Sequence, residues 1–444
     1  MMLTDLPTEV LLDSFGYLPY DSPALVQLRE TSRLLKSAAD DNIGCFLRFN
    51  LGAENDMIMI VGPNRVSMSS TVLERVQEVE GLEFWLSKVR TMTFTDLSHG
   101  GGDSTKEFAA LLERVFGYFE SSDSGIPPFN MYIKALKMGS PESYDIISRI
   151  NSSPLNCRVS LQTYGPSATD ENSAVDVQKP TFLGKKFVEL DFAMFGNEFA
   201  IPYEMSEACE VHDMKIKGYK EHPFMDMVSI VQNANTCNFL NNLTWSSMNL
   251  KLDGTSNLRK LTLPNVQVLD LQDCKLHIED GIKVRRRGTC AAKEIKLSNQ
   301  DPRMLGLFDF PHVTNLFYRH NAKAPVQASR YLDHIVDKLE TLTIQCSMSE
   351  TYNIFSTSSF ATSSIKSLDV TVDHFDSKIM TPLQKLQNLE TLVVYFFEMP
   401  CDDEPEETLD KELDPFLQAL SKACPNLKTV DIAAGDDFSK TLIL

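Results

Sequence analysis

The sequence predicts an α/β fold in which short parallel strands, joined by helices or irregular segments, stack along one axis. Apolar residues recur in the pattern apolar-x-x-apolar-x-apolar, and the starts of ten such triplets are separated by 24, 29, 26, 26, 21, 26, 26, 24 and 38 residues. Amphipathic helix signals lie between several of the triplets. Strands in this order and at this spacing require parallel pairing through right-handed crossovers, and repetition of the unit produces a solenoid.

Each triplet is expected to form the inward-facing side of one strand, because alternate residues of a strand face the same side. The ten triplets are Phe187/Leu190/Phe192, Val211/Met214/Ile216, Leu240/Leu243/Trp245, Val266/Leu269/Leu271, Ala292/Ile295/Leu297, Val313/Leu316/Tyr318, Leu339/Leu342/Ile344, Ile365/Leu368/Val370, Leu389/Leu392/Val394 and Leu427/Val430/Ile432. Two earlier candidates, Val89/Met92/Phe94 and Ile133/Leu136/Met138, indicate longer units of the same array.

Four stretches between the triplets carry helix signals. Ser104 or Thr105 precedes an amphipathic series that ends near Gly125, and further helices are expected to begin near Pro141, Pro325 and Thr408. The last of these is expected to reach Ala423, before a Pro-Asn pair. Residues 165–185 are polar and aperiodic, and residues 398–414 are strongly acidic, so both are predicted to be exposed insertions.

The N-terminal 50 residues predict a separate helical module. Thr4 or Asp5 can accept hydrogen bonds from free amides at a helix start, and Pro7 suits a first helical turn. Leu11, Phe15 and Leu18 then recur at helical spacing and form one apolar stripe. Because about 45 residues cannot bury several amphipathic helices well, apolar surface should remain for a partner; the alternative is an ordinary helical cap on the larger domain.

The segments LTDLPTEVLLDSFGYLPYD (3–21) and LVQLRETSRLLKSAADDNI (25–43) resemble an F-box, and VQVLDLQDCKL (266–276) resembles a leucine-rich repeat. The resemblance implies residues 1–46 as an F-box-like module and 87–444 as a leucine-rich-repeat-like α/β solenoid. Residues 47–86 mix a short apolar run with Gly-Pro and polar turns, so they are expected to be a connector. In the repeat motif, Cys274 is expected to be a buried turn residue. The resemblance also implies anchors for a Skp-type adaptor, namely Leu6, Pro7, Val10, Leu11, Phe15 and Leu18.

Together, the two resemblances imply a non-catalytic substrate-recognition subunit of an SCF-type ubiquitin ligase, which binds a Skp-type adaptor, through it a cullin, and an unidentified target protein. Two alternatives stay open: an F-box protein that acts in assembly or at the kinetochore without degradation, and a plain repeat scaffold without an adaptor. Among the residues that alternate with the triplets, Phe317, Arg319 and Tyr395 are the predicted target-binding residues, since aromatic and Arg side chains dominate interface energetics.

Composition limits the remaining possibilities. A net charge of -19 disfavours nonspecific nucleic-acid binding, because phosphates would be repelled. No apolar run approaches the ~20 residues of a membrane span, and the N-terminus lacks the basic flank of a signal peptide. The nine cysteines form no C-x-x-C pair and fit buried thiols. We therefore expect a soluble protein of the cytoplasm, the nucleus or both.

Motifs for enzymatic chemistry are weak. His99-Gly100-Gly101-Gly102 resembles an esterase oxyanion loop, but the chain has no Gly-x-Ser-x-Gly elbow. Cys274-x-x-His277 has a zinc-like spacing without a second ligand pair, and no phosphate-binding glycine motif is present. The basic run at 285–287 favours a solvated loop. The sequence thus predicts no catalytic residue, no metal and no cofactor.

Overall fold

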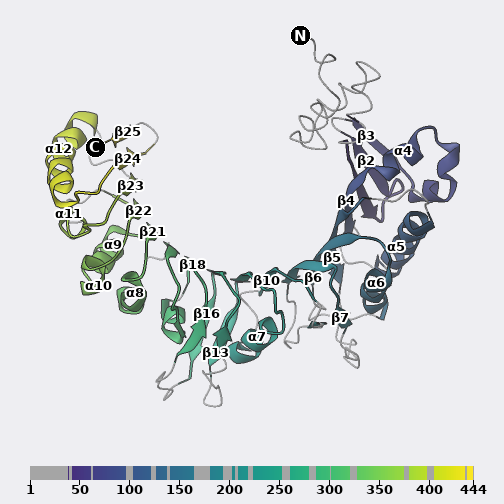
Figure 1. Cartoon of the computed structure of the whole chain (residues 1–444), viewed down its shortest axis with the longest axis horizontal. Helices are drawn as coiled ribbons and strands as arrows, with labels where there is room; N and C mark the ends of the chain where they lie inside the picture. The colour runs from purple at the N-terminus through teal and green to yellow at the C-terminus, as the bar shows by residue number, and fades with distance from the viewer. Residues whose placement is uncertain are drawn as a thin grey trace, which may run out of the picture. The chain divides into compact units, whose positions relative to one another are not determined.

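The computed structural model describes residue 39 and residues 43–443, apart from 62–63, 97–103, 122–126, 138–140, 165–180, 194–202, 206–208, 219–223, 253–260, 280–286, 301, 321–327, 375–379, 398–404 and 436–437. The chain forms two compact units, Met1–Val211 and His212–Leu444. Both are α/β units built on mostly parallel strands (Figure 1). The predicted fold class is confirmed to this extent, whereas the N-terminal helical module falls outside the described residues.

The first unit contains a sheet of five parallel strands. In spatial order they are β1 (Cys45–Leu51), β4 (Val89–Asp96), β5 (Phe129–Lys137), β6 (Cys157–Tyr164) and β8 (Phe187–Ala193). Two antiparallel strands, β2 (Met57–Val61) and β3 (Asn64–Met68), extend the sheet beyond β1. A separate short pair joins β7 (Thr181–Leu183) to β9 (Tyr203–Met205).

Helices pack against one face of this sheet (Figure 1). They are η2 (Ser70–Glu78), α4 (Leu82–Ser87), α5 (Ser104–Ser121) and α6 (Pro141–Ser152). The helices predicted to begin at Ser104 and Pro141 are therefore confirmed. Aromatic side chains join the helix layer to the sheet: the Phe94 ring lies 4.8 Å from the ring of Phe49 and 5.4 Å from that of Phe108.

The segment 47–86, which we expected to be a connector, contains strands of this sheet. The alternation of Cys45, Leu47, Phe49 and Leu51, all buried, makes β1 a half-buried strand that pairs in parallel with β4. Within the same segment, β2 and β3 pair with each other in antiparallel orientation. The expected connector and the observed strands differ because turn residues in a sequence can also join two paired strands, so they do not by themselves mark a linker.

The second unit continues the strand motif as a longer series. Its parallel strands, in spatial order, are β10 (Asp213–Lys217), β12 (Asn242–Ser246), β15 (Val268–Gln272), β18 (Glu294–Ser298), β20 (Asn315–Arg319), β21 (Thr341–Gln345), β22 (Ser367–Val372), β23 (Thr391–Phe396) and β24 (Thr429–Ala434). The antiparallel strand β25 (Phe438–Ile443) follows β24. Every apolar residue of the ten predicted triplets is buried, so the predicted inward face is confirmed.

Helices and short ladders fill the crossovers of the second unit. The helices are η4 (Pro302–Leu307), α7 (Met227–Ala234), α8 (Ser329–Val336), α9 (Met348–Phe355), α10 (Ser358–Ala361), α11 (Met380–Leu383) and α12 (Pro405–Ala423). One ladder is β11 (Met225–Asp226), β13 (Asn249–Leu252) and β16 (Lys275–Ile278), and another is β14 (Thr262–Leu263), β17 (Gly288–Cys290) and β19 (Phe308–Asp309). The helices expected near Pro325 and Thr408 begin at Ser329 and Pro405.

A repeated turn follows three successive strands of the second unit. Ser247, Asp273 and Asn299 stand directly after β12, β15 and β18 and have positive φ angles of 55°, 52° and 50°. Asp and Asn tolerate this left-handed conformation better than most residues. The next residue in each of these turns, Met248, Cys274 or Gln300, is buried. Cys274 Sγ lies 3.4 Å from the carbonyl oxygens of Trp245 and Gln272, which confirms its expected place as a buried turn residue.

Candidate protein-interaction surface

The sheet of the second unit has one covered face and one open face. The buried triplets face the crossovers, which lie on one side of the strands (Figure 1). Residues that alternate with the triplets line the other side, here called the open face, in rows fixed by the strand register. One row reads Lys215, Thr244, Asp270, Lys296, Phe317, Thr343, Asp369, Val393 and Asp431, and the next reads Lys217, Ser246, Gln272, Ser298, Arg319, Gln345, Thr371, Tyr395 and Ala433.

The three predicted target-binding residues all lie on this open face. Phe317 is half-buried and Arg319 is exposed, and they are alternate residues of β20. Tyr395 is half-buried on β23 and shares the row of Arg319. Three strand spacings separate Arg319 from Tyr395, or roughly 14 Å. The structure therefore brings Phe317 and Arg319 together and places Tyr395 apart from them on the same face.

Tyr395 belongs to an aromatic pair that the sequence pattern missed. Its ring meets that of Phe397 edge to face, with centroids 5.3 Å apart and planes at 86°. The Tyr395 hydroxyl donates a hydrogen bond to the carbonyl of Gly435 at 3.4 Å, while Phe397 is 65% exposed. Phe397 directly follows β23, so a search confined to the triplet window excludes it. Continued alternation from Tyr395 was the signal that could have found it.

Carboxylates on the open face are partly desolvated. Asp270 accepts a hydrogen bond of 2.8 Å from Gln272 Nε2, and burial raises its pKa above the usual range even though Lys296 and Lys215 act against the shift. Lys296 Nζ also pairs with a Glu294 oxygen at 3.1 Å. Burial raises the pKa of Asp369 as well. The open face therefore carries both positive and negative side chains. Such a mixture can orient a bound protein, but it does not attract partners of a single net charge.

Behind the open face, a buried polar cluster ties β20 to α9. The Tyr318 hydroxyl donates to Glu350 Oε1 at 2.9 Å, and the rings of Tyr318 and His320 stack with centroids 6.3 Å apart. Glu350 is 3% exposed, and burial raises its pKa. This cluster links a strand to a helix of the next repeat.

Cys274 and His277, which have a zinc-like spacing in the sequence, lie in different environments. Cys274 is buried in its turn, whereas His277 is exposed with its ring 5.2 Å from that of Phe224. Over the described ranges of the chain, no cluster of three or more His, Cys, Asp and Glu side chains could hold a metal ion. The esterase-like glycines at 100–102 fall outside these ranges.

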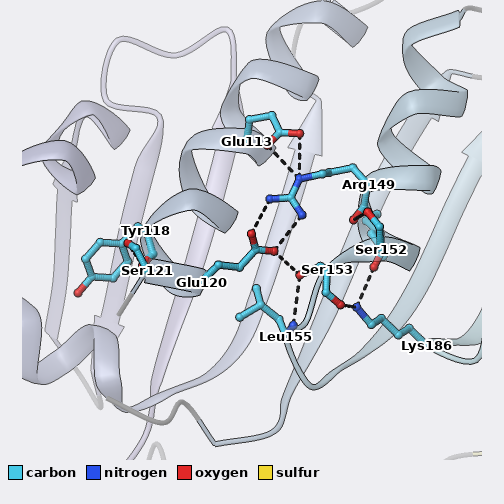
Figure 2. Close-up of polar contacts among 10 residues, drawn as sticks. Glu113, Tyr118, Glu120, Ser121, Arg149, Ser152, Ser153, Leu155 and Lys186 are labelled. Carbon is cyan, nitrogen blue, oxygen red and sulfur yellow. Dashed lines mark hydrogen bonds and ion pairs between the residues drawn. The ribbon is translucent and has the colours of Figure 1, made fainter. Parts of the chain in front are cut away.

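A further polar network, in the first unit, joins two crossovers (Figure 2). Arg149 on α6 reaches Glu113 and Glu120 on α5: its Nε lies 2.9 Å from both Glu113 oxygens, and its NH1 and NH2 groups lie 2.9 and 2.8 Å from the Glu120 oxygens. Ser153 donates to Glu120 at 2.6 Å, and Lys186 donates to the Ile150 carbonyl at 2.8 Å at the end of α6. Local sequence gave no signal for this network, since its members come from three separate segments.

The proposed adaptor anchors Leu6, Pro7, Val10, Leu11, Phe15 and Leu18 fall outside the described residues. No protein-family model matches the chain, and no curated protein matches its sequence. Within the described part of the chain, no helix is long and apolar enough to cross a bilayer.

Proposed function

We propose that this chain is the substrate-recognition subunit of an SCF-type ubiquitin ligase. One observation carries the proposal: a sequence that resembles an F-box over residues 3–43 precedes a series of parallel strands whose open face carries aromatic and Arg side chains. The N-terminal segment binds a Skp-type adaptor and, through it, a cullin. The repeats bind a target protein in the cytoplasm or the nucleus.

The proposed mechanism is proximity. A target held near the ubiquitin-charged enzyme gains effective concentration for transfer to its lysines, and this chain contributes no reacting group. The arrangement of the open face fits such a role, because its groups can bind and orient a protein without covalent chemistry. Phe317 and Arg319 form one contact point, and Tyr395 with Phe397 forms a second contact point on the same face.

Capture of the intact protein, probed for both adaptor and cullin, tests the first half of the proposal. Replacing Pro7 and Leu11 with Ala should weaken adaptor binding at least about a hundredfold, since burying one Leu-sized side chain is worth roughly 1.5 to 3 kcal/mol. Thr8→Ala, at the variable position of the same motif, is the matched control. Undiminished adaptor binding by the double variant would contradict the anchor assignment.

The same experiment separates the alternatives. Adaptor and cullin in the complex, with loss of a captured protein's ubiquitination in the double variant, support a degradative receptor. Adaptor without cullin supports a scaffold that acts outside degradation, and capture of neither supports a plain repeat scaffold.

Target recognition is tested by replacing Phe317, Arg319 and Tyr395 with Ala together. The triple variant should keep its melting temperature and adaptor binding but lose the captured target, because these side chains lie on the open face rather than in the core. If the captured proteins match those of the parent, recognition lies elsewhere, with the polar segment 165–185 and the acidic segment 398–414 as the next candidates.

A further inference from the structure

The first unit carries a cationic surface on the open face of its own sheet. Arg48 on β1, Lys134 on β5 and Arg158 on β6 are exposed and point away from the buried residues of their strands. Within the described part of the chain, none of the three has a hydrogen-bond or ion-pair partner. Unpaired cations grouped on one face are notable in a chain with a net charge of -19.

Strand register places these cations around one aromatic residue. Arg48 shares a row with Thr93, Tyr132 and Ser160. Arg158 pairs with Asn130, two residues before Tyr132, and Lys134 stands two residues after it. Arg48 is therefore roughly 10 Å from Tyr132 across two strand spacings, and the positions of Arg158 and Lys134 differ by roughly 13 Å along the strands.

The rest of this surface contains hydrogen-bonding groups without negative charge. The open-face residues of β1, β4, β5 and β6 are hydroxyl, amide, aromatic or cationic, and none is a carboxylate. Carboxylates begin on the next strand, where Glu189 is opposite Ser160 and Asp191 accepts a hydrogen bond from Gln162. The cationic area is thus bounded on the β8 side.

We propose that this surface, defined by Arg48, Tyr132, Lys134 and Arg158, binds a carboxylate-rich segment of a partner protein in extended conformation. Acidic residues four positions apart in an extended chain are separated by roughly 13 Å, which matches the offset between Lys134 and Arg158. The proposal goes beyond the function proposed above, because it concerns the other unit and holds whether or not the chain binds an adaptor.

A protein segment fits better than a nucleic acid. Binding a phosphate backbone depends on neutralising many phosphate charges. The chain has 61 acidic and 42 basic residues, so its net negative charge repels a long polyanion. A short acidic segment needs only the local cations. Tyr132 adds a half-buried ring and a hydroxyl that can contact the segment between its charged ends.

The test is fluorescence anisotropy with the full-length protein and a fluorescein-labelled Glu-Ser-Glu-Ser-Glu-Ser-Glu peptide. Binding should weaken with added salt and disappear for the Gln-for-Glu peptide. Changing Arg48, Lys134 and Arg158 to Gln together should weaken binding about tenfold or more, since each exposed ion pair contributes modestly. Lys185→Gln, an exposed cation of the same unit outside the strands, is the matched control and should bind like the parent.

A second measurement keeps the test independent of the variant's folding. In the parent protein, bound peptide should protect Lys134, but not Lys185, from acetylation. Equal protection of both lysines, unchanged affinity of the folded triple variant, or tighter binding of a single-stranded DNA or a phosphoserine peptide of equal charge would each overturn the proposal.

Discussion

The two units build similar parallel sheets but fill their crossovers differently. In the first unit, strands of seven to nine residues alternate with long helices: α5 has 18 residues and α6 has 12. In the second, strands β12, β15 and β18 have five residues each, and short parallel ladders replace long helices between them. A long helix, the 19-residue α12, lies only further along this unit, between β23 and β24. Buried strand residues therefore define the sheet in both units, whereas the crossover can change as long as it covers the apolar face.

The means of holding neighbouring crossovers together also differ. Ion pairs centred on Arg149 connect α5 with α6 in the first unit (Figure 2). Close backbone approach connects the ladders of the second unit: a Cβ added at Gly288 would lie 1.9 Å from the Leu261 carbonyl oxygen. Substitutions at these positions test the contrast directly.

The largest effect is expected for Gly288→Ala. The added methyl group cannot fit beside backbone, so β17 must move away from β14, at a cost of about 3 kcal/mol in the free energy of unfolding. Urea unfolding measures this change. Gly117→Ala is the matched control in the first unit, because a Cβ on this helical glycine meets nothing within 4 Å. It should be neutral or stabilise by about 0.5 to 1 kcal/mol, and similar losses for both variants would contradict the contrast.

Arg149→Ala should have the next largest effect. It removes both guanidinium hydrogen bonds from the Glu120 carboxylate, which keeps the hydrogen bond from the Ser153 hydroxyl. It also removes the guanidinium from the Phe116 ring, 5.1 Å away. We expect a loss of about 2 kcal/mol in urea unfolding. Arg149→Lys keeps the positive charge but loses the paired guanidinium hydrogen bonds. Its free energy of unfolding should lie between those of the parent and Arg149→Ala. An unchanged midpoint for the Ala variant would show that the network is only a surface arrangement.

The Arg149 network should also give acid sensitivity. Hydrogen bonding from Arg149 is the main reason that the pKa of Glu120 is lowered. Stability from this carboxylate is therefore present above its unfolded pKa and lost as pH falls through the lower folded pKa. The difference in melting temperature between parent and Arg149→Ala should shrink over that acid range. A constant difference would argue against the ion pair as the cause.

In the second unit, Glu350→Gln should stabilise the fold at neutral pH, in contrast to the destabilising Arg149→Ala. Burial raises the folded pKa of Glu350. The stability that this group contributes is therefore fully present below its unfolded pKa and is lost as pH rises through the folded pKa. Gln can still accept from Tyr318 without the cost of a buried charge. The melting temperature of the variant relative to the parent should rise as pH increases from the unfolded pKa of Glu350 through its raised folded pKa. Destabilisation that grows with pH would contradict this account.

The smallest difference between the units is expected in thiol reactivity. The cysteines at 45, 157, 209, 237, 274, 290, 346 and 424 are free and buried, and burial raises the pKa of Cys45, Cys274, Cys290 and Cys346 to about 12. Replacing the ninth cysteine, Cys401, with Ser restricts labelling to these eight thiols. Labelling of this variant with a thiol reagent should therefore be slow in both units until denaturant is added. Mass spectrometry of the labelled peptides checks this. Rapid native labelling confined to one unit would identify local opening there.

Local sequence patterns predicted the main parallel strands of the second unit. The triplets needed only local alternation, and Cys274 needed only its place in one repeat, so each could be found without the neighbouring strands. Helix starts at Ser104 and Pro141 were equally local. Phe317, Arg319 and Tyr395 were correctly placed on one face because a strand exposes alternate residues wherever it pairs. The N-terminal adaptor anchors and the target site remain predictions.

The contacts between distant segments depend on the tertiary structure. It made β1 a neighbour of β4, so that residues expected to be a connector joined the sheet. It brought Arg149 to Glu113 and Glu120, and it gathered Arg48, Lys134 and Arg158 around Tyr132. The physical reason is that a local pattern fixes which side of a strand a residue occupies, whereas pairing order and register fix its neighbours.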